Sequence, residues 1–192
     1  MATSFSAPHP LARLDGFAPG ERPAIRELAT RIALLADDTP ETELPAAVAD
    51  TLPAYLDHPE LLDPRHTLGA AEQYRRHLLY ADPLRRFSIL ALVWRPGQHT
   101  PVHGHTAWGA VGVYRGRLEV RNYELVDAGN SMLSCTEQHR AEAGPGTTSW
   151  VQTGLQDIHR LACGSAGEAI SIHVYGRDLS QDPGSINIAL PH

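Results

Sequence analysis

The chain has 192 residues, 42% of them hydrophobic and 20% charged, and its formal net charge is -6. A chain of this length and apolar content can form one domain with a proper core. It has no dense run of Lys or Arg, so the composition argues against nucleic acid as a partner. No apolar run approaches the roughly 20 residues of a membrane span, so we expect no membrane contact either.

The N-terminus and the cysteines bear on the cellular compartment. Residues 1–9 lack the basic start and the apolar core of a signal peptide. The two cysteines, Cys135 and Cys163, are too few for a disulfide framework or a Cys-rich zinc site. We therefore expect a cytoplasmic protein whose two thiols are reduced.

Residues 1–70 are predicted to form an irregular arm followed by a small helical layer. The first 20 residues contain three prolines and little apolar periodicity. From Glu21 onward, apolar residues recur at helical spacing, and Pro23 occupies an allowed first-turn position. Two shorter helices are predicted after this one, over residues 41–51 and 53–62.

Residues 71–192 contain short strand patterns bounded by Gly or Pro, which together predict a closed antiparallel barrel or jelly roll. The strands at 109–114 and 117–125 are expected to pair as a hairpin through the turn Arg115-Gly116. We expect residues 1–192 to form a single domain. The other predicted strands are 74–80, 87–94, 131–140, 147–152, 157–162 and 169–175.

His103 and His105 point to chemistry at one of these strands. Side chains two apart on an extended strand share a face, so the two imidazoles form half of a metal site. Gly97, five intervening residues, His-X-His and then Gly116 resemble the first motif of the cupin superfamily, whose β-barrels hold a transition metal. A typical cupin has a metal-binding Glu where this chain has Gly109, so the resemblance implies a site of histidines only.

His159 is the expected third ligand. It lies in a short apolar-flanked strand after the Gly-Pro-Gly turn at 144–146, in the position of the histidine of the second cupin motif. That motif ordinarily runs on to Asn, and here Cys163 occupies this position. Three histidines leave coordination positions open for substrate, as in catalytic metal sites. Imidazole binds Zn, Cu, Fe and Ni, so the ligands alone do not select the metal.

Ser171, His173 and Tyr175 alternate along one predicted strand and therefore face the same way. Together with Trp94 and the three histidines, they resemble the cysteine dioxygenase family of cupin-type thiol dioxygenases, in which a Ser-X-His-X-Tyr strand stands beside a three-histidine Fe(II) centre. The resemblance covers residues 74–175.

The resemblance implies oxidation of a small thiol to its sulfinate with O₂ at Fe(II), with Ser171, His173 and Tyr175 as catalytic residues. His173 would orient the Tyr175 hydroxyl. In mammalian members a cysteine is crosslinked to this tyrosine. Gly109 occupies that position here, as in bacterial members, so the crosslink cannot form there.

Arg76 and Tyr74 are the expected substrate-binding residues. In the family, an arginine at the position of Arg76 grips the substrate carboxylate, whereas mercaptopropionate dioxygenases have glutamine there. Arg75 must point to the opposite face of the strand. L-Cysteine is therefore the first candidate substrate. Three further arginines, any of which would allow a dicarboxylate if it faced the pocket, are Arg85, Arg86 and Arg177.

Other functions stay open at this point. Mercaptosuccinate and 3-mercaptopropionate are alternative thiols for the same chemistry. A zinc- or nickel-dependent cupin isomerase, or a cupin that binds a small molecule without catalysis, would also account for the histidines. The oligomeric state is not predicted.

Overall fold

The computed structural model describes residues 14–15, 22–127, 133–181 and 186–191, and contains a small group of helices and eleven strands in this part of the chain. The helices are α1 (Pro23–Asp38), α2 (Leu44–Thr51), α3 (Pro53–Leu56) and the 3-10 turn η1 (Pro64–Thr67). The strands are β1 (Leu14–Asp15), β2 (Arg75–Ala81), β3 (Ser88–Trp94), β4 (His103–His105), β5 (Gly109–Arg115), β6 (Leu118–Asp127), β7 (Leu133–Ala143), β8 (Thr148–Val151), β9 (Gly154–Cys163), β10 (Ala169–Tyr175) and β11 (Asn187–Ala189).

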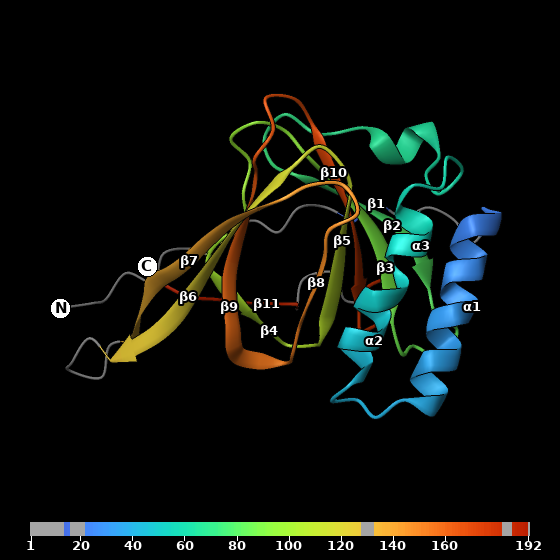
Figure 1. Ribbon diagram of the computed structural model, residues 1–192, viewed down its shortest axis with the longest axis horizontal. Coiled ribbons are helices and arrows are strands. Elements are labelled where there is room, and N and C mark those ends of the chain that lie inside the picture. Colours follow the sequence, from blue (N-terminus) through green and yellow to red (C-terminus); the bar gives the residue numbers. More distant parts are fainter. Residues whose placement is uncertain (1–13, 16–21, 128–132, 182–185, 192) are drawn as a thin grey trace.

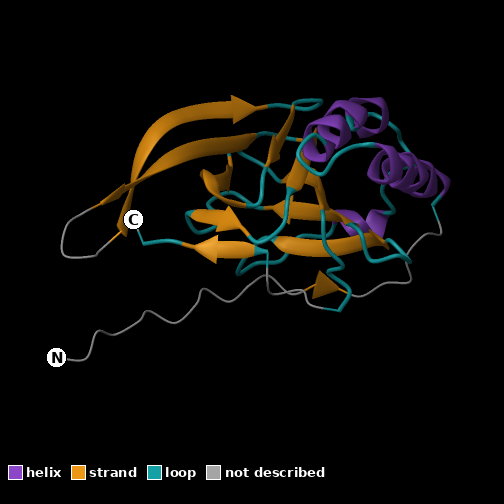
Figure 2. Ribbon diagram, turned by 90° about the horizontal axis from the view of Figure 1, so that it is seen from below, coloured by secondary structure: helices purple, strands orange, loops and turns teal. Residues whose placement is uncertain are grey.

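Two sheets face each other, and helices cover the outer face of one of them (Figures 1 and 2). The six-stranded sheet has the order β1-β2-β3-β10-β5-β8, and the five-stranded sheet has the order β11-β4-β9-β6-β7. All pairs are antiparallel except β1 with β2. The predicted mainly β fold with a small N-terminal helical layer is confirmed.

The helical layer packs on the six-stranded sheet through an amphipathic α1. Pro23 begins this helix, where its missing N–H costs nothing, and Ile25, Leu28 and Ile32 bury one face. These side chains share a core with α2 and with β3 and β10. No described helix combines the length and the apolar character that crossing a membrane requires.

Strands β3 and β10 are interior strands of this sheet, and their two faces serve different cores. In β3, alternate residues pack under the helices or between the two sheets, which explains its continuous apolar run. In β10, Ile170, Ile172 and Val174 face the helices. By alternation, the polar residues of β10 point into the space between the sheets.

The predicted hairpin of residues 109–114 and 117–125 is wrong. Strand β5 pairs with β8 and β10 in one sheet, whereas β6 pairs with β7 and β9 in the other, so the turn at Gly116 crosses between sheets. A Cβ at Gly116 would lie 2.8 Å from the Ala169 Cα, and the φ of +74° also favours glycine. The same turn residues suit a hairpin and a crossing, so local sequence did not distinguish them.

Several element boundaries also differ from the prediction. The third helix ends at Leu56 instead of residue 62, because Pro59 keeps the preceding residue out of the helical region. Leu14 and Asp15 form β1 within the arm that was expected to be irregular, and the rest of residues 1–20 lies outside the described residues. The sequence pattern missed β11 entirely. Residues 131–132 of the predicted strand 131–140 also lie outside the described part.

Candidate functional site

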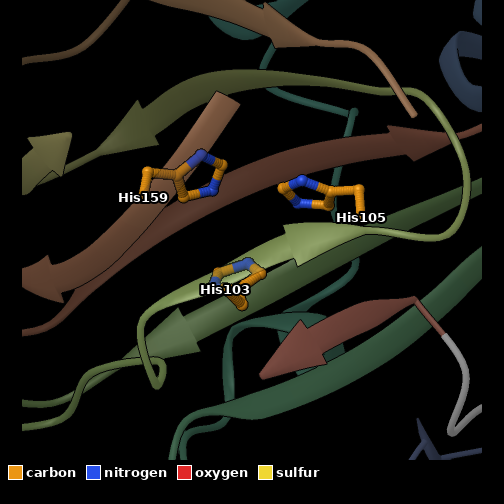
Figure 3. A group of neighbouring side chains, drawn as sticks. All are labelled: His103, His105 and His159. Atoms are coloured by element: carbon orange, nitrogen blue, oxygen red, sulfur yellow. The ribbon is translucent and has the colours of Figure 1, made fainter. Parts of the chain in front are cut away.

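Strands β4 and β9 bring His103, His105 and His159 together (Figure 3). His103 lies directly opposite His159 in the antiparallel pair. Between the two histidines of β4, a Cβ at Gly104 would lie only 2.4 Å from the backbone oxygen of Gly154. Glycine at the middle of the His-X-His motif therefore lets β4 approach β9 closely enough to assemble the three rings.

The three imidazoles converge on one point between the sheets. Their ring centroids are 4.8 Å apart for His103 and His105, 4.7 Å for His103 and His159, and 4.9 Å for His105 and His159. One potential ligand atom from each residue lies within 4.8 Å of the others. His103 and His105 are only 3% and 2% exposed.

Burial keeps all three rings neutral. It lowers the pKa of His103 to about 4 and that of His105 to about 3, and it holds the pKa of His159 well below its usual range. The repulsion among neighbouring histidines adds to the effect for His105 and His159. Neutral imidazole is the form that coordinates a metal ion.

The hydrogen bonds of the rings fit metal coordination as well. Nδ1 of His103 donates to the backbone oxygen of Pro101 over 2.9 Å, which leaves the Nε2 lone pair for a metal. His159 has a hydrogen bond to the backbone of Asp157. Nδ1 of His105, in contrast, is buried and has no hydrogen-bond partner among the described residues. The donor set of three neutral nitrogens therefore fits a divalent transition metal.

The β10 residues singled out in the sequence form one hydrogen-bonded chain. Ser171 Oγ lies 2.8 Å from His173 Nε2, and His173 Nδ1 lies 2.9 Å from the Tyr175 hydroxyl. The chain starts at Trp94, whose Nε1 donates to Ser171 Oγ over 2.9 Å. The sequence pattern placed Trp94 near the first motif but did not reveal this bond.

These bonds limit the directions that the protons can take. Trp94 can only donate, so Ser171 accepts from it, and its hydroxyl can still either donate to His173 Nε2 or accept from it. Where Ser171 donates, the proton of neutral His173 is on Nδ1 and points at the Tyr175 oxygen. Burial lowers the pKa of His173 to about 3 and raises the pKa of Tyr175, so both stay in these neutral forms. In that arrangement the Tyr175 hydroxyl proton is left available to the cavity.

Arg76 and Tyr74 line the same cavity as the histidines and Tyr175. The Arg76 side chain is 4% exposed, whereas its neighbour Arg75 is only half-buried. Tyr74 stacks on Trp94 with ring centroids 4.4 Å apart. With the histidines neutral, Arg76 is the only lining residue among those described that carries a full charge.

The other lining residues include several that sequence reasoning missed. Thr100 lies before His103 in the chain, and Leu161 lies after His159. Asn187 belongs to the unpredicted β11, and Ile186 is the residue before this strand. Their positions depend on strand pairing and had no motif signal. The remaining described lining residues are Leu92, Gly109, Ala110, Val111, Trp150 and Val151.

The three further arginines are not among the described lining residues. Arg85 Nε donates to Asp178 over 3.1 Å. Arg86 binds Asp82 and Asp37 at the end of α1. The cavity therefore offers one guanidinium in the described part of its wall.

Comparison with solved structures finds similar folds at low sequence identity. The protein TT1209 from Thermus thermophilus has a TM-score of 0.47 and 19% identity, over 62% of this chain and 97% of that one. A Cupin 2 conserved barrel domain protein from Salinispora arenicola has a TM-score of 0.42 and 18% identity, over 59% and 84% of the two chains. A structure of oxalate oxidase has a TM-score of 0.46 and 21% identity, over 67% and 63%. No family model matches the chain.

Proposed function

We propose that this chain is a metal-dependent enzyme that uses Fe(II) and O₂ to oxidise a small carboxylated thiol, L-cysteine first, to its sulfinate. The observation that supports the proposal is the sharing of one cavity by the three histidines, Arg76 and the hydroxyl of Tyr175. Fe(II) held by the histidines would supply the one-electron chemistry that lets O₂ react with a thiol. Both oxygen atoms of one O₂ end on the substrate sulfur.

Arg76 supplies the grip on the substrate. A guanidinium meets a carboxylate with two parallel charge-assisted hydrogen bonds, which are roughly twice as strong as neutral ones. Because Arg76 is almost fully buried, solvent screens such a pair weakly. Tyr74 stacks on Trp94, which supports the part of the cavity wall beside Arg76.

Tyr175 donates a hydrogen bond into the cavity. His173 fixes the hydroxyl oxygen in place, and Ser171 and Trp94 hold the ring of His173. The raised pKa of Tyr175 keeps the phenol protonated, so it acts as a donor to oxygen atoms of the substrate or product. The two polar groups that contact substrate thus come from strands far apart in the sequence, β2 and β10.

The charge of the cavity ranks the candidate thiols. One buried guanidinium favours a thiol with one carboxylate, since Arg85 and Arg86 bind acidic side chains elsewhere. Mercaptosuccinate, with a second carboxylate, therefore ranks below L-cysteine. 3-Mercaptopropionate also has one carboxylate, so the charge of the cavity does not exclude it. We rank it below L-cysteine because Arg76 resembles the arginine of cysteine dioxygenases.

The test is oxygen uptake by the Fe(II)-loaded protein with L-cysteine, mercaptosuccinate and 3-mercaptopropionate. We expect fastest uptake with L-cysteine, one O₂ consumed per thiol, and a product heavier by two oxygen atoms in mass spectrometry. Zn(II)-loaded protein is the matched control and should be inactive, because zinc has no redox chemistry. If iron-loaded protein takes up no O₂ with any thiol, the proposed thiol oxidation is refuted. The alternative functions are then a different metal-dependent cupin enzyme or a binding protein. Fastest turnover of 3-mercaptopropionate would refute the role given to Arg76.

A further inference from the structure

Strand β11 places Asn187 directly opposite His105. The next pair along the ladder, Ile186 and Thr106, shares a backbone hydrogen bond of 2.8 Å from Thr106 N to Ile186 O. Hydrogen-bonded and non-hydrogen-bonded pairs alternate in an antiparallel ladder, so Asn187 and His105 form a non-hydrogen-bonded pair. Side chains of such a pair approach each other most closely and lie on the same face of the sheet.

His105 differs from the other two histidines in its hydrogen bonds. His103 has the backbone oxygen of Pro101 as an acceptor, and His159 has the backbone of Asp157. Nδ1 of His105 is buried without a partner among the described residues. A histidine that binds a metal ion through one nitrogen almost always donates the other N–H to an acceptor, which fixes the tautomer and the ring orientation.

The residues of β11 match this difference between the histidines. Ala189 lies opposite His103, which already has its acceptor, and offers no polar atom. Asn187 lies opposite His105 and offers a side-chain carbonyl. The Asn Oδ1 and the His Nδ1 are each two bonds beyond their own Cβ, so the two atoms have the same reach from their strands. Asn187 also lines the cavity that contains the rings.

We propose that Asn187 is a positioning residue for His105: its side-chain oxygen accepts the Nδ1 proton and holds Nε2 toward the metal. The bond requires only a side-chain rotation of Asn187 within the existing pair. This inference rests on the three-histidine metal site of the proposed function. It does not depend on which thiol is oxidised.

The test measures Co(II) binding to the purified metal-free chain by competition with a chelator and by the visible spectrum of the bound ion. Asn187→Leu keeps the number and branching of the side-chain heavy atoms and removes the acceptor, and we expect affinity about 10 to 100-fold below wild type. Asn187→Asp retains an acceptor and should bind within about threefold of wild type, with the wild-type spectrum. Ile188→Ala, on the opposite face of β11, is the matched control and should bind as wild type does. Asn187→Ala repeats the test if the Leu variant does not fold.

Two outcomes would overturn the inference. One is wild-type Co(II) affinity in Asn187→Leu or Asn187→Ala protein that unfolds at the wild-type temperature. The other is a variant with wild-type affinity but a raised KM for the thiol, which would mean that Asn187 faces substrate. A wild-type chain that binds no Co(II) would instead refute the metal site of the proposed function.

Discussion

Gly109 lies directly opposite Tyr175 across β5 and β10, and a Cβ at this glycine would lie 3.1 Å from both Cδ1 and Cε1 of the tyrosine ring. Contacts this short require the ring to shift by a few tenths of an ångström. The absence of a side chain at Gly109 therefore leaves room for the phenol ring in this position.

Gly109→Ala is expected to displace the Tyr175 hydroxyl while leaving the metal ligands in place. Small misplacements of a group that contacts substrate are costly, so kcat should fall by about tenfold to a hundredfold. Iron content should equal that of wild type. Gly144→Ala, where an added Cβ meets no atom within 4 Å, is the control for the substitution itself. Unchanged turnover in Gly109→Ala would show that the ring position is not critical.

Replacing His103, His105 or His159 with Ala should abolish iron binding and activity together. Each substitution removes one of three nitrogens that lie within 4.8 Å of one another. The measurement is iron per chain after loading and desalting, with oxygen uptake on the same sample. His99, whose Nδ1 bonds to the Thr100 oxygen, is the control, and His99→Ala should keep its iron. Full iron content in any one of these three variants would show that the replaced histidine is not a metal ligand.

Tyr175→Phe should separate metal binding from turnover. The Tyr175 hydroxyl forms its hydrogen bond with His173, which is not one of the three expected metal ligands, so iron content should stay at the wild-type level. Loss of the donor should lower kcat by about one to two decades. Steady-state oxygen uptake and metal analysis of one preparation give both values. Equal turnover in the variant and wild type would make Tyr175 a structural residue only.

Arg76→Gln should weaken substrate binding much more than Arg75→Gln. Of these two arginines, only Arg76 lines the cavity, since adjacent residues of β2 point to opposite faces. KM for the preferred thiol should rise by one or two decades, which corresponds to about 1.4 to 3 kcal/mol of lost carboxylate binding. Initial rates over a range of thiol concentrations measure the change. Equal effects of the two substitutions would assign the carboxylate to another residue.

His66 should make the fold sensitive to acid. It is buried, and its Nδ1 accepts the backbone N–H of Asp63 at the start of η1. Burial, followed by repulsion from His77, lowers its pKa to about 4, below the value of an unfolded chain. The unfolded state then binds the proton more tightly, so this contribution to the free energy of unfolding is complete above about pH 6.5 and is lost as the pH falls toward 4.

The loss at pH 5.5 is about 1.4 kcal/mol for this one group. Urea unfolding of wild type and His66→Gln at about pH 7.5 and pH 5.5 measures it, and the loss in the variant should be smaller than that in wild type by about this amount. His58 is the matched control: it also accepts a backbone N–H through Nδ1, from Glu60, but is exposed. His58→Gln should keep the wild-type pH dependence. If the unfolding free energy of His66→Gln depends on pH as that of wild type does, the prediction is contradicted.

The sequence by itself determined the arrangement of residues along each strand. Ser171, His173 and Tyr175 share a face, and Arg76 and Arg75 do not, because side-chain direction alternates within an extended segment whatever its partners are. The same holds for His103 and His105 on β4. The mainly β fold class also followed from the sequence, since short apolar segments bounded by Gly and Pro are a local signal.

Only the tertiary structure decided which strands lie side by side. Gly116 begins a crossing between sheets and not a hairpin, since β5 pairs with β8 and β10 whereas β6 pairs with β7 and β9. The bond from Trp94 to Ser171 joins residues 77 positions apart, and the pair of Asn187 and His105 comes from a strand with no sequence signal. Register between distant segments depends on how all faces are buried together, so no window of sequence contains it.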